Sequence, residues 1–450
     1  MFNVKWLMEI FPESKVELES HDIEIKTVNT DSRNLLTNSL FVPLEGENFN
    51  GHDYVTQAIE NGAIAVIWNK EKPIDKIPKE ISIFLVDNTL EALQMLAQAY
   101  RNLINPKVIG ITGSNGKTTT KDLLHAALNK QFITKATEGN YNNHIGLPLT
   151  ILSMSVKTEI LILEMGMSNF GEIALLSKIA KPDIAIITNI GESHIEHLGS
   201  RAGISQAKLE IIKYMDDQGV LIVDGDEPLL EKIDFKGKLV KCGYTNGNEY
   251  IISNVSLSEK GTTFNINNEP YQIPLLGNHN AQNTSFVIAA TEMLNVSHQR
   301  VQDGLSQVRV TNMRFELIKG KNDVSLINDA YNASPSSMKA SIEVVNNLKG
   351  YHEKILVLGD ILELGVNIEK YYIDIAKKII DTDIKCVYTY GDTSSLLSDY
   401  LNNHSDISAK HFSEKKLLVN TLENKALKDN LIFFKASRGI KLENIIDEIK

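Results

Sequence analysis

The stretch Ile111-Thr112-Gly113-Ser114-Asn115-Gly116-Lys117-Thr118-Thr119 decides the fold of this 450-residue chain. An apolar run at 107–112 leads into it and predicts a buried strand, while the apolar spacing of 118–129 predicts a helix directly after it. A glycine-rich turn between a strand and a helix lets backbone N–H groups approach phosphate oxygens. Lys117 can reach the terminal phosphates and Thr118 can bind Mg²⁺. The stretch therefore predicts a nucleoside triphosphate site.

The spacing of this phosphate loop is Gly-x-x-Gly-Lys-Thr, counted from Gly113, because Ile111 stands where the standard motif has its first glycine. A glycine turn that merely caps a helix is the alternative. Strand, glycines, lysine and threonine follow one another in the expected order, which favours the nucleotide site.

Strands and helices alternate beyond the phosphate loop. Apolar runs at 160–163, 184–188 and 220–223 are separated by helical patterns. This alternation is typical of a doubly wound parallel α/β sheet. A polar, more β-like insertion at 250–273 precedes a helix that starts near Asn280.

The same patterns predict three α/β domains, with boundaries near residues 105 and 310. Residues 1–105 form a small mixed α/β domain, which Asn105-Pro106 separates from the central domain at 106–310. In residues 311–450 strands again alternate with helices, as in a Rossmann-like fold, and the expected strands are 354–358, 385–390 and 431–435.

Composition limits the function. The chain has 46 Lys plus Arg against 57 Asp plus Glu, a net charge of -11, which disfavours nonspecific binding to nucleic acid or to an anionic membrane. Its 2 cysteines are too few for a disulfide framework and indicate a reducing compartment. We find no signal-peptide pattern and no run of 18 apolar residues, so we expect a cytoplasmic protein without integral membrane association.

Two polar residues follow neighbouring strands of the expected sheet. Glu164 ends the first run after the phosphate loop, and His194 comes after the next. Both side chains should point into the crevice of the phosphate loop, where they could meet a metal. Mg²⁺ prefers oxygen ligands, however, and a histidine here is more often a turn residue. His194 with His197 suggests zinc, but no third ligand has suitable spacing.

Two other candidates have ordinary explanations. Lys208 lies in an amphipathic helical pattern, so a solvated surface lysine is the simplest interpretation. Asp224 and Asp226 form an acidic pair after a strand, and Asp-Gly-Asp in that position favours a turn.

Taken together and in order, these motifs resemble the ATP-dependent Mur ligase family over the whole chain. The resemblance rests on the phosphate loop, on Glu164 and on the segments 189–194, 207–210 and 277–283. Segments at 30–33, 41–46 and 51–53 are similar to the uridine-nucleotide-binding domain of the members that add the third residue and the terminal dipeptide.

Two further motifs distinguish those members. Residues 139–150 and 329–338 are similar to the ligases that join D-alanyl-D-alanine to UDP-N-acetylmuramoyl-tripeptide, and the Asp-Asn-Pro-Arg motif of the diaminopimelate-adding members is absent. The resemblance thus implies these two substrates, ATP, two Mg²⁺ ions and an acyl-phosphate intermediate in peptidoglycan synthesis. We also expect a monomer, and from the net charge a protein that binds no nucleic acid.

The resemblance assigns a role to each site residue. Lys117 would hold the β- and γ-phosphates, Asn280 would read adenine, and Arg314 and Asp329 would close over the nucleotide from the third domain. The remaining ATP contacts would be Gly113, Ser114, Asn115, Gly116, Thr118 and Thr119.

By the same resemblance, Thr118 and Glu164 would hold one Mg²⁺, and His194 with a carbamylated Lys208 the second. Lys117, Lys208, His194 and Arg314 would be the catalytic residues. The expected substrate-binding residues are Ser32, Arg33 and Gly46 near the uridine diphosphate, and Asn140 and Asn143 near the peptide.

Two competing functions are open. One is a nonenzymatic, ATP-switched interaction protein, which gives no role to residues 139–150; the other is a sister ligase that attaches a single amino acid. Four positions in the domain expected to face the dipeptide depart from the family pattern: Asn328, Ser334, Tyr372 and Ala436.

Overall fold

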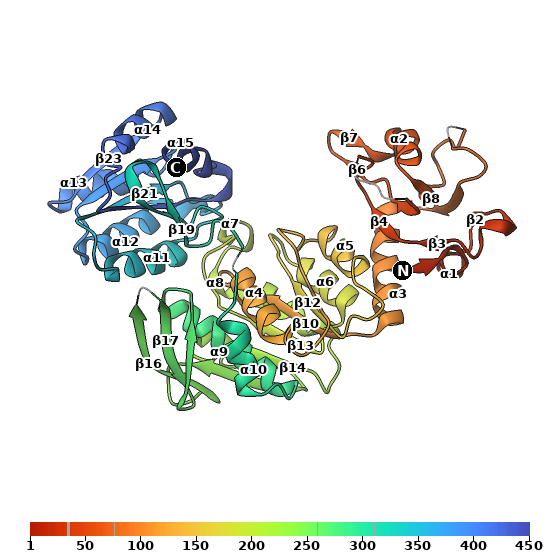
Figure 1. Cartoon of the computed structure of the whole chain (residues 1–450), viewed down its shortest axis with the longest axis horizontal. Coiled ribbons are helices and arrows are strands. Elements are labelled where there is room, and N and C mark those ends of the chain that lie inside the picture. Colours follow the sequence, from red (N-terminus) through yellow and green to blue (C-terminus); the bar gives the residue numbers. More distant parts are fainter. Residues whose placement is uncertain (34–36, 76, 259, 310) are drawn as a thin grey trace.

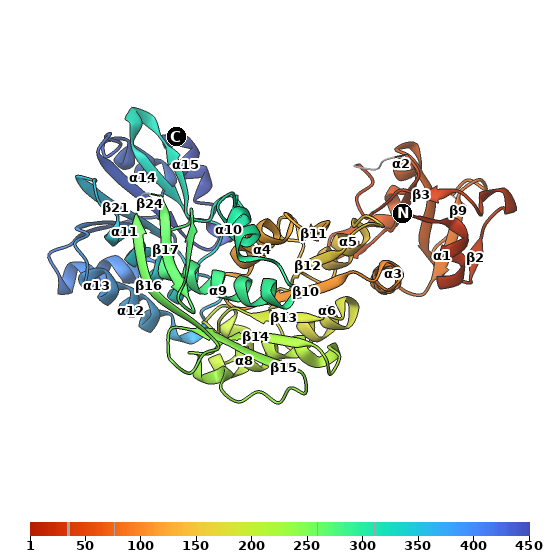
Figure 2. The same cartoon turned by 60° about the horizontal axis from the view of Figure 1, so that its bottom comes forward.

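The computed structural model describes residues 1–33, 37–75, 77–258, 260–309 and 311–450. Three α/β bodies follow one another along the chain, with the N-terminal and C-terminal bodies at opposite ends and the central sheet between them (Figure 1 and Figure 2). The expected boundary near residue 310 falls on a residue outside the described ranges. Within those ranges, none of the helices combines the length and hydrophobicity needed to cross a lipid bilayer.

The N-terminal body is built on a five-stranded sheet in the order β2-β9-β8-β5-β4, in which only β2 runs antiparallel to its neighbour. Two small hairpin-like pairs, β1 with β3 and β6 with β7, complete it. Its elements are β1 (Phe2–Asn3), α1 (Val4–Ile10), β2 (Ser14–Lys15), β3 (Glu24–Ile25), β4 (Thr27–Asn29), β5 (Ser39–Phe41), β6 (Glu45–Gly46), β7 (Phe49–Asn50), α2 (Val55–Glu60), β8 (Ala63–Asn69) and β9 (Ser82–Val86).

Helix α3 (Thr89–Ile104) joins the N-terminal body to the central one. The Asn88 side chain accepts hydrogen bonds from two backbone N–H groups in the first turn of α3. Asn105, in the left-handed conformation with φ 53°, ends the helix. The helix packs against the central body, where the Tyr100 hydroxyl donates to the Met154 carbonyl at 3.0 Å. One continuous apolar core therefore runs from the N-terminal sheet to one face of the central sheet.

The central body confirms the expected doubly wound sheet. Its nine strands lie in the order β11-β12-β10-β13-β14-β15-β16-β17-β18, parallel from β11 to β16 and antiparallel thereafter. The strands are β10 (Lys107–Thr112), β11 (Thr134–Ala136), β12 (Ile160–Glu164), β13 (Ile184–Ile187), β14 (Val220–Asp224), β15 (Lys238–Gly243), β16 (Tyr250–Ser258), β17 (Gly261–Ile266) and β18 (Glu269–Ile273). The β-like insertion thus extends the sheet as antiparallel hairpins.

Helices cover both faces of this sheet. One face packs under α4 (Lys117–Leu128), α9 (Asn278–Met293) and α10 (His298–Leu305). The other packs under α5 (Gly146–Leu152), α6 (Glu172–Ala180) and α8 (Arg201–Leu209), with the short α7 (Ile195–Leu198) before α8.

The C-terminal body has a six-stranded sheet in the order β19-β20-β24-β21-β22-β23, parallel except for β19. Helices α11 to α13 cover one face, and α14 and α15 the other. The connections therefore change face between the neighbours β21 and β24. The elements are β19 (Glu316–Lys319), β20 (Ser325–Asn328), α11 (Pro335–Asn347), β21 (Glu353–Gly359), α12 (Ile368–Ile380), β22 (Cys386–Tyr390), α13 (Ser395–His404), β23 (Ser408–Phe412), α14 (Lys415–Glu423), β24 (Asn430–Lys435) and α15 (Glu443–Ile449).

A close contact between α10 and α4 depends on Gly304. A side chain there would collide with the backbone carbonyl of Ala126 in α4. We expect Gly304→Ala to destabilise the protein by about 1–3 kcal/mol, because the two helices must separate to admit the methyl group. Urea denaturation followed by far-UV circular dichroism measures the loss. Gly247→Ala, where a Cβ would meet nothing within 4 Å, is the control; equal midpoints for the two variants would contradict the prediction.

Candidate active site

A cleft of about 1090 Å³ opens between the central sheet and the C-terminal body. Parallel strands of the central sheet end at this cleft, as expected for an open α/β sheet. Its walls bring together most of the residues expected from the sequence: Ser114, Asn115, Gly116, Lys117, Thr118, Thr119, Asn140, Asn143, Glu164, His194, Lys208, Asn280, Arg314 and Asp329.

The phosphate loop is tightly constrained. Gly113 has φ 147° and Gly116 has φ 80°, values that residues with a side chain rarely adopt. A Cβ would also collide with Thr188 at the first position and with Asn283 at the second. The loop is tied to the strand beside it, since the Asn115 N–H donates to the Asn189 side chain at 3.0 Å. Both glycines are therefore required by the backbone path.

Lys117 begins α4 and turns back over the loop. Its Nζ donates to the Gly113 carbonyl at 2.8 Å. Desolvation in the cleft lowers the pKa of Lys117, the nearby Arg314 charge acts in the same direction, and Glu164 opposes them. A cation held in this way is suited to an anionic ligand.

Thr118 connects the phosphate loop to Glu164 at the end of β12 and to Arg314 in the C-terminal body. Its hydroxyl donates to Glu164 Oε2 at 2.8 Å and accepts from Arg314 Nη2 at 2.7 Å. The second oxygen of Glu164 accepts from the Asn142 side chain at 2.9 Å. A hydroxyl and a carboxylate side by side are oxygen donors of the kind Mg²⁺ prefers. Arg314 reaches this point from the C-terminal body.

Lys208 is buried, with 2% of its surface exposed, so the interpretation as a solvated surface lysine is wrong. It lies on the inner face of α8 and lines the cleft. No hydrogen bond or ion pair of its ammonium group occurs among the described residues. Burial lowers its pKa well below the ordinary value, and repulsion from Lys117 adds to the effect.

His194 lies at the start of α7 with a positive φ of 64°. Its Nδ1 is 2.5 Å from Glu363 Oε2 in the C-terminal body. Burial lowers the pKa of His194, and Glu363 opposes the shift. Over the described ranges, no three His, Cys, Asp or Glu side chains form a metal-binding group, so the pairing of His194 with His197 gains no support as a zinc site.

The acidic pair after β14 forms a turn, as expected. The Asp226 N–H donates to Asp224, and the Asp226 carboxylate accepts hydrogen bonds from the loop at 244–248. Asp224 also lines the cleft, and burial raises its pKa to about 6.

The side of the cleft expected to hold adenine is formed by the start of α9. Asn280 is 6% exposed; its Nδ2 donates to the Leu276 carbonyl at 2.9 Å, and its Oδ1 accepts from Asn283 at 3.2 Å. An amide has four hydrogen-bonding positions in all, so one donor and one acceptor remain for a ligand.

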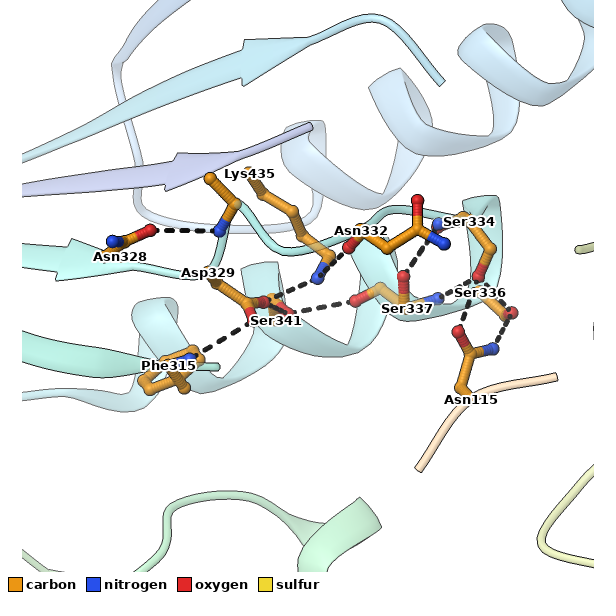
Figure 3. Close-up of polar contacts among 11 residues, drawn as sticks. Asn115, Phe315, Asn328, Asp329, Asn332, Ser334, Ser336, Ser337, Ser341 and Lys435 are labelled. Atoms are coloured by element: carbon orange, nitrogen blue, oxygen red, sulfur yellow. Dashed lines mark hydrogen bonds and ion pairs between the residues drawn. The ribbon is translucent and has the colours of Figure 1, made fainter. Parts of the chain in front are cut away.

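Asp329 organises the C-terminal wall (Figure 3). Its carboxylate accepts from Lys435 Nζ at 2.6 Å, from the Ser341 hydroxyl at 2.8 Å and from the Phe315 N–H at 3.2 Å. Because Phe315 directly follows Arg314, these bonds hold the segment that carries the guanidinium. The Arg314 guanidinium in turn lies 4.2 Å from the centre of the Tyr331 ring.

The start of α11 contacts the phosphate loop directly. Asn115 Nδ2 donates to the Ser336 hydroxyl at 3.1 Å, and the Ser334 hydroxyl donates to Asn115 Oδ1 at 3.0 Å (Figure 3). The Ser336 N–H also donates to Glu192 at 3.3 Å. The C-terminal body is therefore closed onto the loop.

The expected uridine-binding residues lie in the N-terminal body and do not line the cleft. The Ser32 hydroxyl donates to Gln57 at 2.6 Å, and Arg33, largely exposed, pairs with Asp31. Gly46 belongs to β6, where a side chain would collide with Phe49.

A second cavity of about 480 Å³ adjoins the cleft. It lies beside the loops after β21 and β24, where the C-terminal connections change face, which is the usual ligand position in such sheets. Asn140, His194 and Tyr331 line both cavities. Arg438 and Glu363 bring opposite charges to the second.

Sequence reasoning missed several side chains that build the site: Asn142, Tyr331, Glu363, Lys435 and Arg438. Asn142 and Tyr331 lie within the motifs at 139–150 and 329–338, and Lys435 and Arg438 lie beside Ala436, a position already compared with the family pattern. Their partners belong to distant parts of the chain, so their spacing alone carried no signal.

Family models match nearly the whole chain. Residues 24–101 match the Mur ligase family catalytic domain, 111–291 the Mur ligase middle domain, and 313–438 the Mur ligase glutamate ligase domain.

Individual relatives agree. The chain is 48% identical to the UDP-N-acetylmuramoyl-tripeptide–D-alanyl-D-alanine ligase of Bacillus subtilis over 94% of this chain and 93% of that one. Its fold is similar to a MurF crystal structure from Acinetobacter baumannii, with a TM-score of 0.88, 29% identity and coverage of 99% and 98%. It is also similar to the MurF ligase of Thermotoga maritima in complex with ADP, with a TM-score of 0.82, 27% identity and coverage of 94% and 97%. The chain belongs to the Mur ligase family.

Proposed function

We propose that this protein joins D-alanyl-D-alanine to UDP-N-acetylmuramoyl-tripeptide at the expense of ATP. The observation that carries the proposal is that the phosphate loop, with Lys117 and Thr118, opens into a cleft that adjoins a charged cavity of the C-terminal body. The names of the curated relatives supply the substrates.

We divide the work among three domains. Residues 1–105 bind the uridine end of the muramoyl peptide, 106–310 bind ATP, and 311–450 bind the dipeptide and close the cleft. Ser32, Arg33 and Gly46 are assigned to the uridine diphosphate, and Asn140 and Asn143 to the peptide. Asn143 already accepts hydrogen bonds from the N–H groups that begin α5, so its free amide N–H₂ is the group assigned to substrate.

Lys117 and the loop N–H groups hold the ATP phosphates, and Thr118 and Glu164 supply oxygen donors for one Mg²⁺. Bound Mg²⁺ neutralises charge on the transferring phosphoryl group. Arg314, supported by Tyr331 and Asp329, faces the same phosphates from the C-terminal body. Asn280 uses its remaining donor and acceptor for adenine.

Lys208 is assigned a carbamate. A buried amine without an acidic partner favours its neutral form, and a neutral amine can take up carbon dioxide. The carbamate oxygens, together with His194, then suit a second Mg²⁺.

In the first chemical step, the terminal carboxylate of the tripeptide attacks the γ-phosphorus, and ADP leaves with the electron pair of the broken P–O bond. In the second, the dipeptide amine attacks the carbonyl carbon of the acyl phosphate; inorganic phosphate leaves and the amine loses a proton. We place the dipeptide in the second cavity, where Arg438 faces its carboxylate. Closure of the C-terminal body excludes the water that would hydrolyse the acyl phosphate.

The deciding experiment is phosphate release with muramoyl tripeptides carrying L-lysine or meso-diaminopimelate, each offered D-alanyl-D-alanine or a free amino acid. A dipeptide ligase requires tripeptide and dipeptide together. Turnover without either substrate would indicate an ATP-switched protein, and preference for a free amino acid would indicate a sister ligase.

Lys117→Ala should lower ligation by at least about 10²–10³-fold, because a charge directed at the phosphates is lost. Binding of the uridine nucleotide peptide, measured by calorimetry, should stay nearly unchanged, since that site lies in another domain. A large loss of peptide affinity in the folded variant would contradict the division of domains.

Asn280→Ala should raise the KM for ATP more than it lowers kcat, because a group that reads adenine binds ground and transition states alike. One or two lost hydrogen bonds correspond to about 1–3 kcal/mol. Steady-state kinetics separate the two parameters, with Asn278→Ala, an exposed neighbour, as the control. A loss of kcat with an unchanged KM for ATP would contradict the prediction and indicate that Asn280 acts in the chemical step.

Lys208→Ala should lower kcat by about two decades or more. The substitution removes a proposed ligand of the second Mg²⁺, which would stabilise the transferring phosphoryl group. Short carboxylic acids should restore part of the activity, and ¹³C NMR under labelled carbon dioxide should show a carbamate signal in the wild type only. Lys213→Ala, exposed one turn later, is the control. Normal turnover of Lys208→Ala would rule out the carbamate.

A further inference from the structure

His194 and Glu363 form a two-point contact between the central and C-terminal bodies. His194 Nδ1 is 2.5 Å from Glu363 Oε2, and the Glu196 N–H donates to the Glu363 carbonyl at 3.3 Å. Both His194 and Glu363 have positive φ, 64° and 60°. Residues other than glycine rarely adopt such angles, and they persist where surrounding contacts hold them. The backbone on each side is thus arranged for this contact.

The contact also determines which ring nitrogen of His194 is free. A carboxylate only accepts, so the neutral ring carries its proton on Nδ1 and leaves a lone pair on Nε2. The ring lines both the cleft and the second cavity. A histidine that binds a metal usually donates its other ring N–H to a carboxylate in this way.

The segment that carries Glu363 is anchored within the C-terminal body by its neighbours. The Leu362 N–H donates to the Ser437 hydroxyl at 2.9 Å, and the Ser437 N–H donates to the Asp360 carbonyl at 3.0 Å. The Asp360 carboxylate accepts from three backbone N–H groups of the loop after β22. Glu363 therefore moves with the C-terminal sheet and reaches His194 only when that body lies against the central one.

We propose that Glu363 is a positioning residue that orients His194 Nε2 toward the second metal when the C-terminal body closes. This inference rests on the function proposed above, which gives His194 that metal. Occupancy of the second ion then depends on closure, so the phosphoryl-transfer site is complete only after the dipeptide-binding body is in place.

The test counts Mn²⁺ ions, as probes for Mg²⁺, by electron paramagnetic resonance with a nonhydrolysable ATP analogue bound. Glu363→Ala should lower the affinity for the second Mn²⁺ by about 10–100-fold and leave the affinity for the first unchanged. Glu363→Gln should retain most of the affinity, because its amide oxygen still accepts from Nδ1–H. Thermal denaturation confirms that each variant is folded.

Two controls separate orientation from other effects. Ser336→Ala removes a different contact of the closed state, the hydrogen bond with Asn115. It should not selectively lower the affinity for the second Mn²⁺. Glu369→Ala changes an exposed carboxylate of the same body, which makes no side-chain hydrogen bond or ion pair in the described structure, and should change nothing.

Equal Mn²⁺ binding by wild type and Glu363→Ala would overturn the inference and leave the proposed function intact. Equal loss of affinity for the second Mn²⁺ in Glu363→Ala and Ser336→Ala would also overturn it. Glu363 would then act only by stabilising the closed state. A single Mn²⁺ in the wild type would overturn both the inference and the second-metal assignment.

Discussion

Positive charge held away from water is the constraint on which the cleft depends. Burial lowers the pKa of Lys117 and of Lys208, and the charge of Lys117 adds to the shift of Lys208, which favours its neutral form. Arg314 adds a second cationic group, beside Thr118. The carboxylate of Glu164 lies beside them but is already hydrogen-bonded to Thr118 and Asn142. The site is therefore built to receive an anionic ligand, and a nucleoside triphosphate has the required charge.

The same constraint explains why two bodies share the site. The central body supplies the phosphate loop, while Arg314 and the start of α11 come from the C-terminal body. A cleft assembled from separate bodies can open to exchange substrates and close to exclude water. The hydrogen bonds described across it, through Asn115, Thr118, Glu192, His194 and Glu196, are polar contacts that suit a reversible closure.

The departures from the family pattern have local structural roles. Ser334 caps α11 and also donates to Asn115, so a hydroxyl serves both contacts. Tyr372 is buried, and its hydroxyl accepts from the Ile361 N–H and bonds Thr393, which supports the loop that carries Glu363. Asn328 accepts from the Ala330 N–H just beyond β20. The close approach of Gly359 to the Ala436 methyl group leaves no room for a larger side chain at that glycine.

The sequence by itself determined the α/β architecture, the phosphate loop and the family, because these depend on local periodicity and on short motifs whose residues are neighbours in the chain. Most of the site residues expected from the sequence also line the cleft, since strand ends meet at one edge of a parallel sheet. Only the tertiary structure showed that Lys208 is buried, because helix amphipathicity does not say which polar residue faces inward. Only it paired His194 with Glu363 and Asp329 with Lys435, whose partners are 169 and 106 positions apart. Contacts over such separations depend on how the bodies pack, which no local pattern encodes.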